Sequence, residues 1–419
     1  MTAPTLVPTR HPDRPRRAPG LGPFAALLGI GEPSPQRWRA LGESLLVGDE
    51  PMDRLVEWMY AEGMATTRPL FDRALHAGID SVPAAPAPLR EFFELVETTP
   101  DWVDPALLRQ GERVFRSGGT DGLYFARDVS FLGGYLASGF NKTLLRTGAL
   151  EKGPARRFAE TLQWAMDVSS ENGMDTFGAG YRSTLHVRFI HALVRRHVTA
   201  MPDWRGEEWG VPINQTDMAA TLVGALLAPF VGGMALGIVP SPRETAAAAH
   251  LTRYVGWLIG VQEQWLPTGF RDGVAILHHC LGAITNPDET SRRLARPMAD
   301  DPLHWHHPNL PRLRGRIARA QHLSVASAFL GPKAMRILGL PYVPPWYPAL
   351  RIPVNLVRSG LVRLVPGGAD RAAVRGPREQ GAVRRNQIGD IPAGHRRDHS
   401  PGPRRAGPGR SRPGPPAQP

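Results

Sequence analysis

The stretch Thr184-Leu-His-Val-Arg-Phe-Ile-His-Ala-Leu-Val-Arg-Arg-His-Val198 decides how the rest of the chain is interpreted. At the helical period of about 3.6 residues per turn, Arg188, His191 and Arg195 fall on one face of a helix. Valines and Thr184 fill the other positions of that face, so the face should point into the protein. The stretch therefore predicts a buried helix that carries one imidazole between two guanidiniums, each about one turn away.

A buried arginine is costly unless an anionic group meets it. Haem would meet both needs, because its iron can bind His191 and its two propionates can bind Arg188 and Arg195. Two alternatives remain open: His191 could be an ordinary core histidine, and the arginines could pair with carboxylates of neighbouring helices. Since His186 and His197 lie off this face, His191 is the candidate metal ligand of the stretch.

A second face of mixed character lies in the preceding predicted helix. This helix begins at Pro154 and ends near Asn172-Gly173, and it carries Arg157, Thr161 and Trp164 in line. A charge and a hydroxyl among bulky apolar groups are also typical of an ordinary half-exposed helix. Taken alone, this face does not distinguish a binding site from a solvated surface.

The composition predicts one large domain with two polar ends. Of 419 residues, 42% are hydrophobic, which is enough for a single core in residues 19–366. The formal net charge is +12, but residues 371–419 carry 11 Arg against three acidic residues, a net +8 (11 − 3), which leaves +4 for the rest. Residues 1–18 and 367–419 are therefore predicted to be a disordered leader and a disordered basic tail.

The excess of arginine in this tail suggests a polyanion as its partner. It could be a non-specific anchor for nucleic acid or anionic lipid, but nothing in it predicts specific nucleic-acid recognition.

The single cysteine, Cys280, excludes an internal disulfide and a Cys-ligated iron–sulfur cluster. Arg16-Arg17 precedes a short, Gly-rich apolar run without a cleavage site, so we expect a cytoplasmic protein, with twin-arginine export as the alternative.

The remaining pattern predicts helices throughout. Residues 218–239 carry no formal charge, but Pro229 and four glycines interrupt them, so two buried helices are expected there instead of a stable membrane span. Residues 341–366 are predicted to be an irregular strap. The histidines at 278–279 and 304–307 lack a supporting carboxylate at a metal-binding offset. Because no sustained alternation of apolar and polar residues occurs, the predicted class is all-α.

Taken together, these residues resemble the rubber oxygenases (latex-clearing proteins) and the related oxygenases of mycophenolic acid biosynthesis. The family's axial-histidine helix has the pattern Arg-x-x-His-x-x-x-Arg, matched by Arg188, His191 and Arg195. Its distal helix has an Arg followed four residues later by a Thr, matched by Arg157 and Thr161. The resemblance also includes Gly42, Gly48-Asp49, residues 100–104, Gly111, residues 255–261 and Leu266-Pro267.

This resemblance implies a helical bundle around a globin-like three-over-three core that encloses haem b. It implies that His191 is the proximal iron ligand and that Arg157 and Thr161 line the oxygen side. Arg188 and Arg195 would support the haem or its propionates. The implied activity is a haem-dependent oxygenase reaction of dioxygen with a small apolar substrate, which would be unsaturated or prenylated.

Two departures from the family pattern leave the substrate open. Rubber-cleaving members have a lysine directly before the distal threonine, where this chain has Glu160. An ionised carboxylate accepts hydrogen bonds and does not donate them, so Glu160 could redirect or abolish the chemistry. Asn141 stands, by offset, where those members have a glutamate. A non-catalytic haem-based oxygen or redox sensor, or a haem carrier, is therefore the alternative function.

Overall fold

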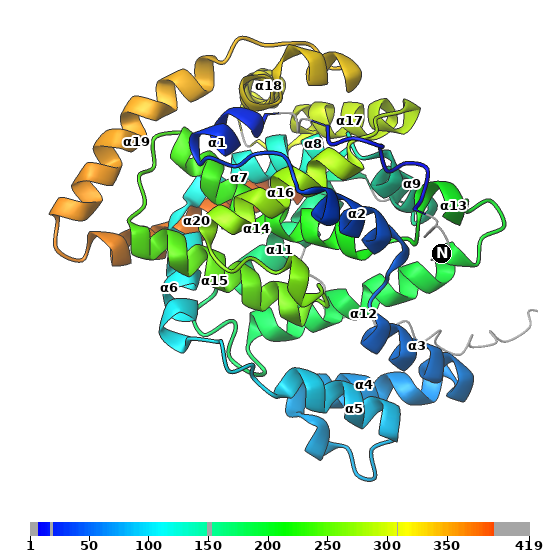
Figure 1. Cartoon of the computed structure of the whole chain (residues 1–419). Coiled ribbons are helices and arrows are strands. Elements are labelled where there is room, and N and C mark those ends of the chain that lie inside the picture. The colour runs from blue at the N-terminus through cyan, green and yellow to red at the C-terminus, as the bar shows by residue number, and fades with distance from the viewer. Residues whose placement is uncertain (1–6, 17–19, 149–152, 308, 389–419) are drawn as a thin grey trace, which may run out of the picture.

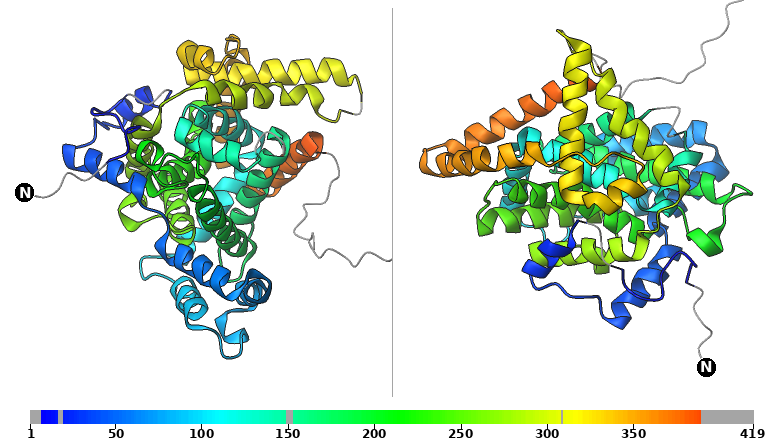
Figure 2. Two further views of the ribbon diagram at one scale, coloured as in Figure 1. Left: turned by 90° about the vertical axis from the view of Figure 1, so that its right-hand side faces the viewer. Right: turned by 90° about the horizontal axis from the view of Figure 1, so that it is seen from above.

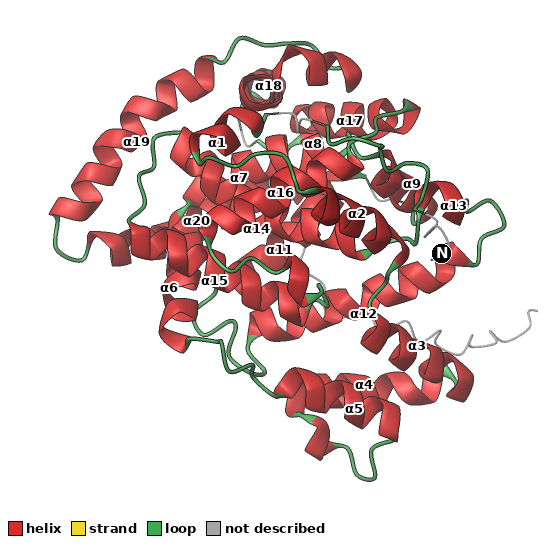
Figure 3. Cartoon of the chain, viewed as in Figure 1, coloured by secondary structure: helices red, strands yellow, loops and turns green. Residues whose placement is uncertain are grey.

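The computed structural model describes residues 7–16, 20–148, 153–307 and 309–388, and these form helices joined by loops (Figures 1 and 3). Within these ranges, the only β-type pairing is an isolated bridge between Ala137 and Asn286. The all-α prediction is confirmed, whereas the globin-like three-over-three arrangement stays a prediction. In chain order the elements are α1 (Gly22–Leu27), α2 (Pro35–Glu43), η1 (Ser44–Leu46), α3 (Glu50–Glu62), α4 (Met64–Ala77), η2 (Ile79–Ser81), α5 (Ala87–Glu97), α6 (Pro105–Ser117), α7 (Gly119–Phe125), η3 (Ala126–Phe131), α8 (Leu132–Gly134), α9 (Ser138–Arg146), α11 (Pro154–Val168), α12 (Ala179–Thr199), α13 (Gly206–Trp209), α14 (Gln215–Ala235), α15 (Pro242–Leu258), η4 (Glu263–Trp265), α16 (Phe270–Ile284), α17 (Glu289–Asp300), η5 (Asp301–His304), α18 (Pro311–Ile337), α19 (Trp346–Leu364) and α20 (Gly368–Ile388).

Helix α12 holds the stretch from which the sequence analysis began. It packs against α11, α3, α15 and α4, so it lies inside the bundle. The loop before it is fixed by the buried side chain of Glu112, whose carboxylate accepts hydrogen bonds from the backbone N–H groups of Asn172 (3.1 Å) and Met174 (3.0 Å). Because buried backbone donors need acceptors, this carboxylate fixes the direction in which the chain enters α12.

Helix α14 corrects the expectation of two helices meeting at Pro229. It is one helix from Gln215 to Ala235 with Pro229 inside it. Proline removes one backbone hydrogen bond from a helix, and packing against α16 and α15 compensates for that loss here. By length and composition, α14 is the one described helix that could cross a membrane, but 61% of its most apolar window is buried inside the protein.

The predicted disordered leader is wrong for residues 7–16, which pack on the domain. The guanidinium of Arg10 is 5% exposed and donates to the carboxylate of Asp217 on α14 at 2.7 Å. The ring N–H of Trp38 donates to the carbonyl of Pro12 at 3.0 Å, and the ring of His11 lies 4.5 Å from that of Trp38. Residues 1–6 and 17–18 of the predicted leader lie outside the described residues.

Replacing Arg10 should therefore destabilise the whole domain. Arg10→Met leaves the buried carboxylate of Asp217 without its counter-charge, and we expect a loss of about 3 kcal/mol in the free energy of unfolding. Arg14→Met is the matched control, because Arg14 lies on the same segment but is exposed. Urea titration of the two variants measures the difference, and equal midpoints would contradict this account.

The C-terminal part differs most from expectation. Residues 346–364 form the helix α19 where an irregular strap was predicted, and residues 368–388 of the predicted disordered tail form α20. Figure 2 shows these two helices projecting from one side of the bundle. Helix α20 packs on α6, where Gly376 approaches the carbonyl of Arg116 so closely that a side chain would not fit. Residues 389–419 lie outside the described residues.

Residues 119–146, expected as one helix from 121 to 140, are divided. The α-helix α7 changes into the π-helical turn η3, and α8 then ends before α9 begins. A π-helical turn inserts an extra residue per turn and rotates the side chains that follow. It places Phe131 beside the first half of α11, where it meets Arg157.

Candidate functional site

The two mixed faces identified in the sequence meet between α11 and α12. The indole N–H of Trp164 on α11 donates to the hydroxyl of Thr184 on α12 at 3.0 Å. Arg157 precedes Trp164 by seven residues, and His191 follows Thr184 by seven. Seven residues are two helical turns, about 10 Å along the axis, so each of these side chains shares the face of the residue that makes the contact. The face of α11 that carries Arg157 and the face of α12 that carries His191 are therefore the faces on which the two helices pack against each other.

His191 has the properties of an uncommitted imidazole. Its side chain is half-buried, its Nδ1 is shielded from water, and no described residue hydrogen-bonds to that nitrogen. Burial lowers the pKa of His191 to about 4, and the neighbouring guanidinium of Arg195 contributes to that shift. The ring is therefore neutral near pH 7, and a neutral imidazole has the lone pair that a metal ligand needs.

This pKa shift predicts a pH dependence of stability. Between pH 6.5 and 4, the unfolded chain binds a proton at His191 and the folded chain does not, so folding loses stability as the pH falls. We expect about 2 kcal/mol of loss at pH 5 relative to pH 7 from this group, and no contribution above pH 6.5. Denaturant titrations of haem-free wild type and His191→Gln at both pH values measure it. An equal loss in both proteins would contradict the assignment.

The polar residues of α11 lie near aromatic rings. The guanidinium of Arg157 lies 5.6 Å from the ring centre of Phe131 and near the phenol of Tyr135. The hydroxyl of Thr161 donates to the carbonyl of Arg157 at 3.2 Å, which leaves its lone pairs for a second partner. Burial raises the pKa of Tyr135, so the phenol stays protonated. A guanidinium donor and a hydroxyl acceptor thus stand beside an aromatic surface, while their predicted contact with dioxygen stays a prediction.

Glu160 lies away from the contact between α11 and α12, and its predicted effect on the chemistry stays a prediction. Its side chain is exposed on the outer face of α11 and pairs with Arg156 at 3.2 Å. Glu160 follows Arg156 by one turn, so the two charges satisfy each other at the surface. The carboxylate therefore does not occupy the space in front of Thr161, where it would affect the chemistry.

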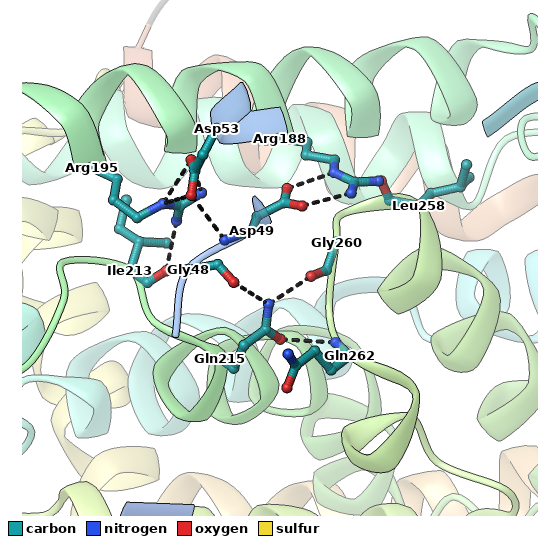
Figure 4. A network of polar contacts seen from close by, with 10 residues as sticks. All are labelled: Gly48, Asp49, Asp53, Arg188, Arg195, Ile213, Gln215, Leu258, Gly260 and Gln262. Carbon is teal, nitrogen blue, oxygen red and sulfur yellow. Dashed lines mark hydrogen bonds and ion pairs between the residues drawn. The ribbon is translucent and has the colours of Figure 1, made fainter. Parts of the chain in front are cut away.

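The two arginines that flank His191 bind carboxylates (Figure 4). The guanidinium of Arg188 donates to both oxygens of Asp49, at 2.6 and 2.7 Å. That of Arg195 binds the carboxylate of Asp53 at 2.8 to 2.9 Å. The arginines therefore pair with carboxylates of a neighbouring helix, which is the alternative that the sequence left open. A contact of either guanidinium with a cofactor propionate stays a prediction.

A shell of hydrogen bonds surrounds these ion pairs. The remaining guanidinium donors bind the carbonyls of Leu258 (3.1 Å, from Arg188) and Ile213 (2.8 Å, from Arg195). The amide of Gln215 donates to the carbonyls of Gly48 (2.8 Å) and Gly260 (2.9 Å), as Figure 4 shows. Charges buried in this way are stable only when their donors and acceptors are satisfied. The network fixes the rotation of α12 and, with it, the direction in which His191 points.

Sequence reasoning missed Asp49 and Asp53 as partners, although a signal exists. Asp49 stands at the N-cap of α3, a position where an aspartate usually caps its own helix, but its carboxylate makes no capping bond. Asp53 follows four residues later, within α3. Gly260 is required beside this site, because its φ is +91° and a side chain on it would meet the carboxylate of Asp49.

The other candidates from the sequence are not brought to this site. Asn141 is fully buried, and its amide donates to the carbonyl of Tyr135 at 2.7 Å. His279 contacts the carbonyl of Gly31 at 3.0 Å. No group of three or more His, Cys, Asp or Glu side chains that could hold a metal occurs among the described residues. A metal at His191 would therefore have to bring its other ligands with it, as the iron of a porphyrin does.

Comparison with known proteins identifies the family. The sequence model described as "ER-bound oxygenase mpaB/B'/Rubber oxygenase, catalytic domain" matches residues 123–365, which is more than half of the chain. The chain belongs to this family. The matched region includes η3, α11 and α12, so every residue proposed above on the two facing helices lies within it.

Two relatives agree with this rubber oxygenase family assignment. A rubber oxygenase from Streptomyces sp. (strain K30) is 28% identical over 207 residues, which are 47% of this chain and 47% of the relative. The chain thus matches about half the length of that curated relative. The structure of latex clearing protein LCP in the closed state has the same fold, with a TM-score of 0.59 and 19% identity over 79% of this chain and 91% of that one. The predicted family, one of oxygenases, is confirmed.

Proposed function

We propose that this protein is a haem b-dependent oxygenase that uses dioxygen on an apolar, unsaturated substrate of the polyisoprene or prenyl type. The observation that carries the proposal is the state of His191: a neutral, half-buried imidazole on an inner helix, with an unpartnered nitrogen. Membership in a family of oxygenases supports the reaction class. The curated relative is named a rubber oxygenase, which supports the substrate class.

The residues present fit a haem group. His191 supplies the single protein ligand that a porphyrin-bound iron requires, and burial keeps that ligand deprotonated. Arg157, on the helix packed against α12, supplies a cationic donor, and Thr161 would supply a second donor once its hydroxyl turns away from the carbonyl of Arg157. When bound, haem supplies the iron that takes up and activates dioxygen. Donors of this kind favour negative charge that develops on an oxygen in a site with little water.

Arg188 and Arg195 have a positioning role in this proposal. Their carboxylate partners are on or beside α3, so each ion pair fastens α12 to the first third of the chain. A helix that cannot rotate holds its imidazole at a constant angle, which is what a metal ligand requires. The ring of Phe131 beside Arg157 adds an apolar surface that suits a hydrocarbon substrate.

The alternative of a non-catalytic haem sensor or carrier loses its motivation. It rested on a carboxylate at Glu160 beside the cofactor, and that carboxylate is at the surface, paired with Arg156. An oxygenase is therefore the function that the site supports best.

A spectrum and an oxygen electrode test the proposal. Protein from haem-supplemented cells should show a Soret band and about one iron per chain, and it should consume oxygen when given polyisoprene latex or a short prenyl alcohol. A colourless, iron-free protein would overturn the haem assignment. A haem protein that binds oxygen without consuming it, on either substrate, would instead establish the sensor or carrier.

A further inference from the structure

Helix α19 turns an apolar face outward along its whole length. Leu350, Val354, Val357, Leu361 and Leu364 follow one another at spacings of four and three residues, so they form one stripe. All five are exposed, and Leu364 is 81% exposed. Trp346 lies exposed at the start of the same face. Figure 1 shows α19 at an edge of the molecule, with its outer side free of other helices.

The face that α19 turns toward the protein is polar instead. Asn355 is fully buried and donates to the carboxylate of Asp121 (2.9 Å) and to the carbonyl of Leu236 (3.0 Å). Arg351 binds both oxygens of Asp121, at 2.9 and 2.7 Å. An ordinary surface helix buries its apolar stripe and exposes its polar one. Because α19 does the reverse and its polar contacts are specific, its orientation is fixed and the apolar stripe needs a partner outside the chain.

Positive charge follows this apolar stripe in the sequence. Arg371, Arg375 and Arg378 are exposed on the first half of α20, which packs beside α19. The 31 residues after Ile388 add six arginines against two aspartates. An apolar helix face with a tryptophan at one end and an adjoining excess of arginine matches a membrane surface that contains anionic lipid.

We propose that α19 is a peripheral membrane-binding element. Its stripe from Leu350 to Leu364 enters the headgroup boundary of an anionic bilayer, and the exposed arginines of α20, Arg371, Arg375 and Arg378, bind lipid phosphates and carboxylates. Such contact needs no membrane-spanning helix. It rests on α19 and the charge of the C-terminal segment alone, so it stands or falls independently of the proposed haem chemistry.

A second copy of the chain fits this surface less well. Pairing two α19 stripes would bring two segments of net charge +8 together, which is electrostatically unfavourable. Ile352 and Leu356 are also exposed, beside the stripe, so the apolar surface is wider than the narrow seam of a helix pair. A bilayer accommodates both the width and the charge.

Vesicle sedimentation tests the proposal with the full-length protein. Wild type should sediment with vesicles of phosphatidylcholine and phosphatidylserine, and much less with phosphatidylcholine alone or at high salt. Leu350→Gln with Leu361→Gln should lower the partition coefficient at least about tenfold, because two leucine side chains that the lipid would bury are replaced by polar ones. Both leucines are exposed, so folding is unaffected.

The matched control moves the same change to another helix. Leu313 and Ile317 on α18 are exposed to nearly the same extent as the leucines of α19, at 53% and 51% against 61% and 55%. Leu313→Gln with Ile317→Gln should bind vesicles like wild type. Equal loss in both double variants, or none in either, would overturn the proposal. So would a wild type that ignores vesicles but forms dimers that the α19 variant abolishes, as measured by sedimentation velocity.

Discussion

His191→Ala should lose the haem, and oxygen uptake should be lost with it. The imidazole is the histidine that α12 carries between Arg188 and Arg195, and both of these arginines are bound to carboxylates. We expect the affinity for haem to fall at least about a hundredfold, which corresponds to about 3 kcal/mol. Titration of haem into the haem-free protein, followed at the Soret band, measures the loss.

Two controls make this result specific to the ligand bond. His197→Ala changes an exposed histidine of the same helix and should bind haem like wild type. Free imidazole added to His191→Ala should restore the spectrum of a histidine-ligated haem, because it can enter the space that the side chain leaves. An unchanged affinity in His191→Ala, or an equal loss in His197→Ala, would contradict the assignment of His191.

Asp49→Ala should strongly destabilise the fold. It leaves the guanidinium of Arg188, which is 4% exposed, buried without a counter-charge. Removing one partner of a buried ion pair costs about 3 to 5 kcal/mol. Urea unfolding of the haem-free protein measures this loss, and Glu50→Ala, which affects only an exposed pair with Arg54, should cost less than about 0.5 kcal/mol.

A double substitution separates two effects of the Asp49–Arg188 ion pair, which are the positioning of α12 and the stabilisation of the fold. Asp49→Leu with Arg188→Met removes both charges and should recover most of the lost free energy, because an apolar pair fills the same buried space. If the ion pair also sets the rotation of α12, this double variant should still bind haem more weakly than wild type. Full stability together with wild-type haem affinity would limit the pair to a structural role.

The sequence allowed the inward face of α12 to be predicted, but not its partners. Arg188 and His191 fall on that face by periodicity alone, and the structure buries it. Asp49 and Asp53 are 139 and 142 residues away from the arginines they bind. Local patterns carry no information about such distant pairs. The sequence therefore indicated that the arginines need carboxylate partners, but it could not tell haem propionates from aspartates elsewhere in the chain.

The errors at the two ends arise from composition. Proline and glycine suggested disorder after residue 367, yet in α20 Gly376 is what permits close packing on α6. Pro345 and Pro348 lie at the beginning of α19, where proline is compatible with a helix. Average composition cannot distinguish a glycine that loosens a chain from one that fits a contact, because the contact is made by residues far away.

The ion pairs of the N-terminal segment have a consequence for synthesis of the chain. Arg10 pairs with Asp217, and Asp49 pairs with Arg188. Neither ion pair can form until its distant partner has left the ribosome. Nascent domains fold as units once their contacts are available. These two buried ion pairs therefore cannot form before α12 and α14 have been synthesised.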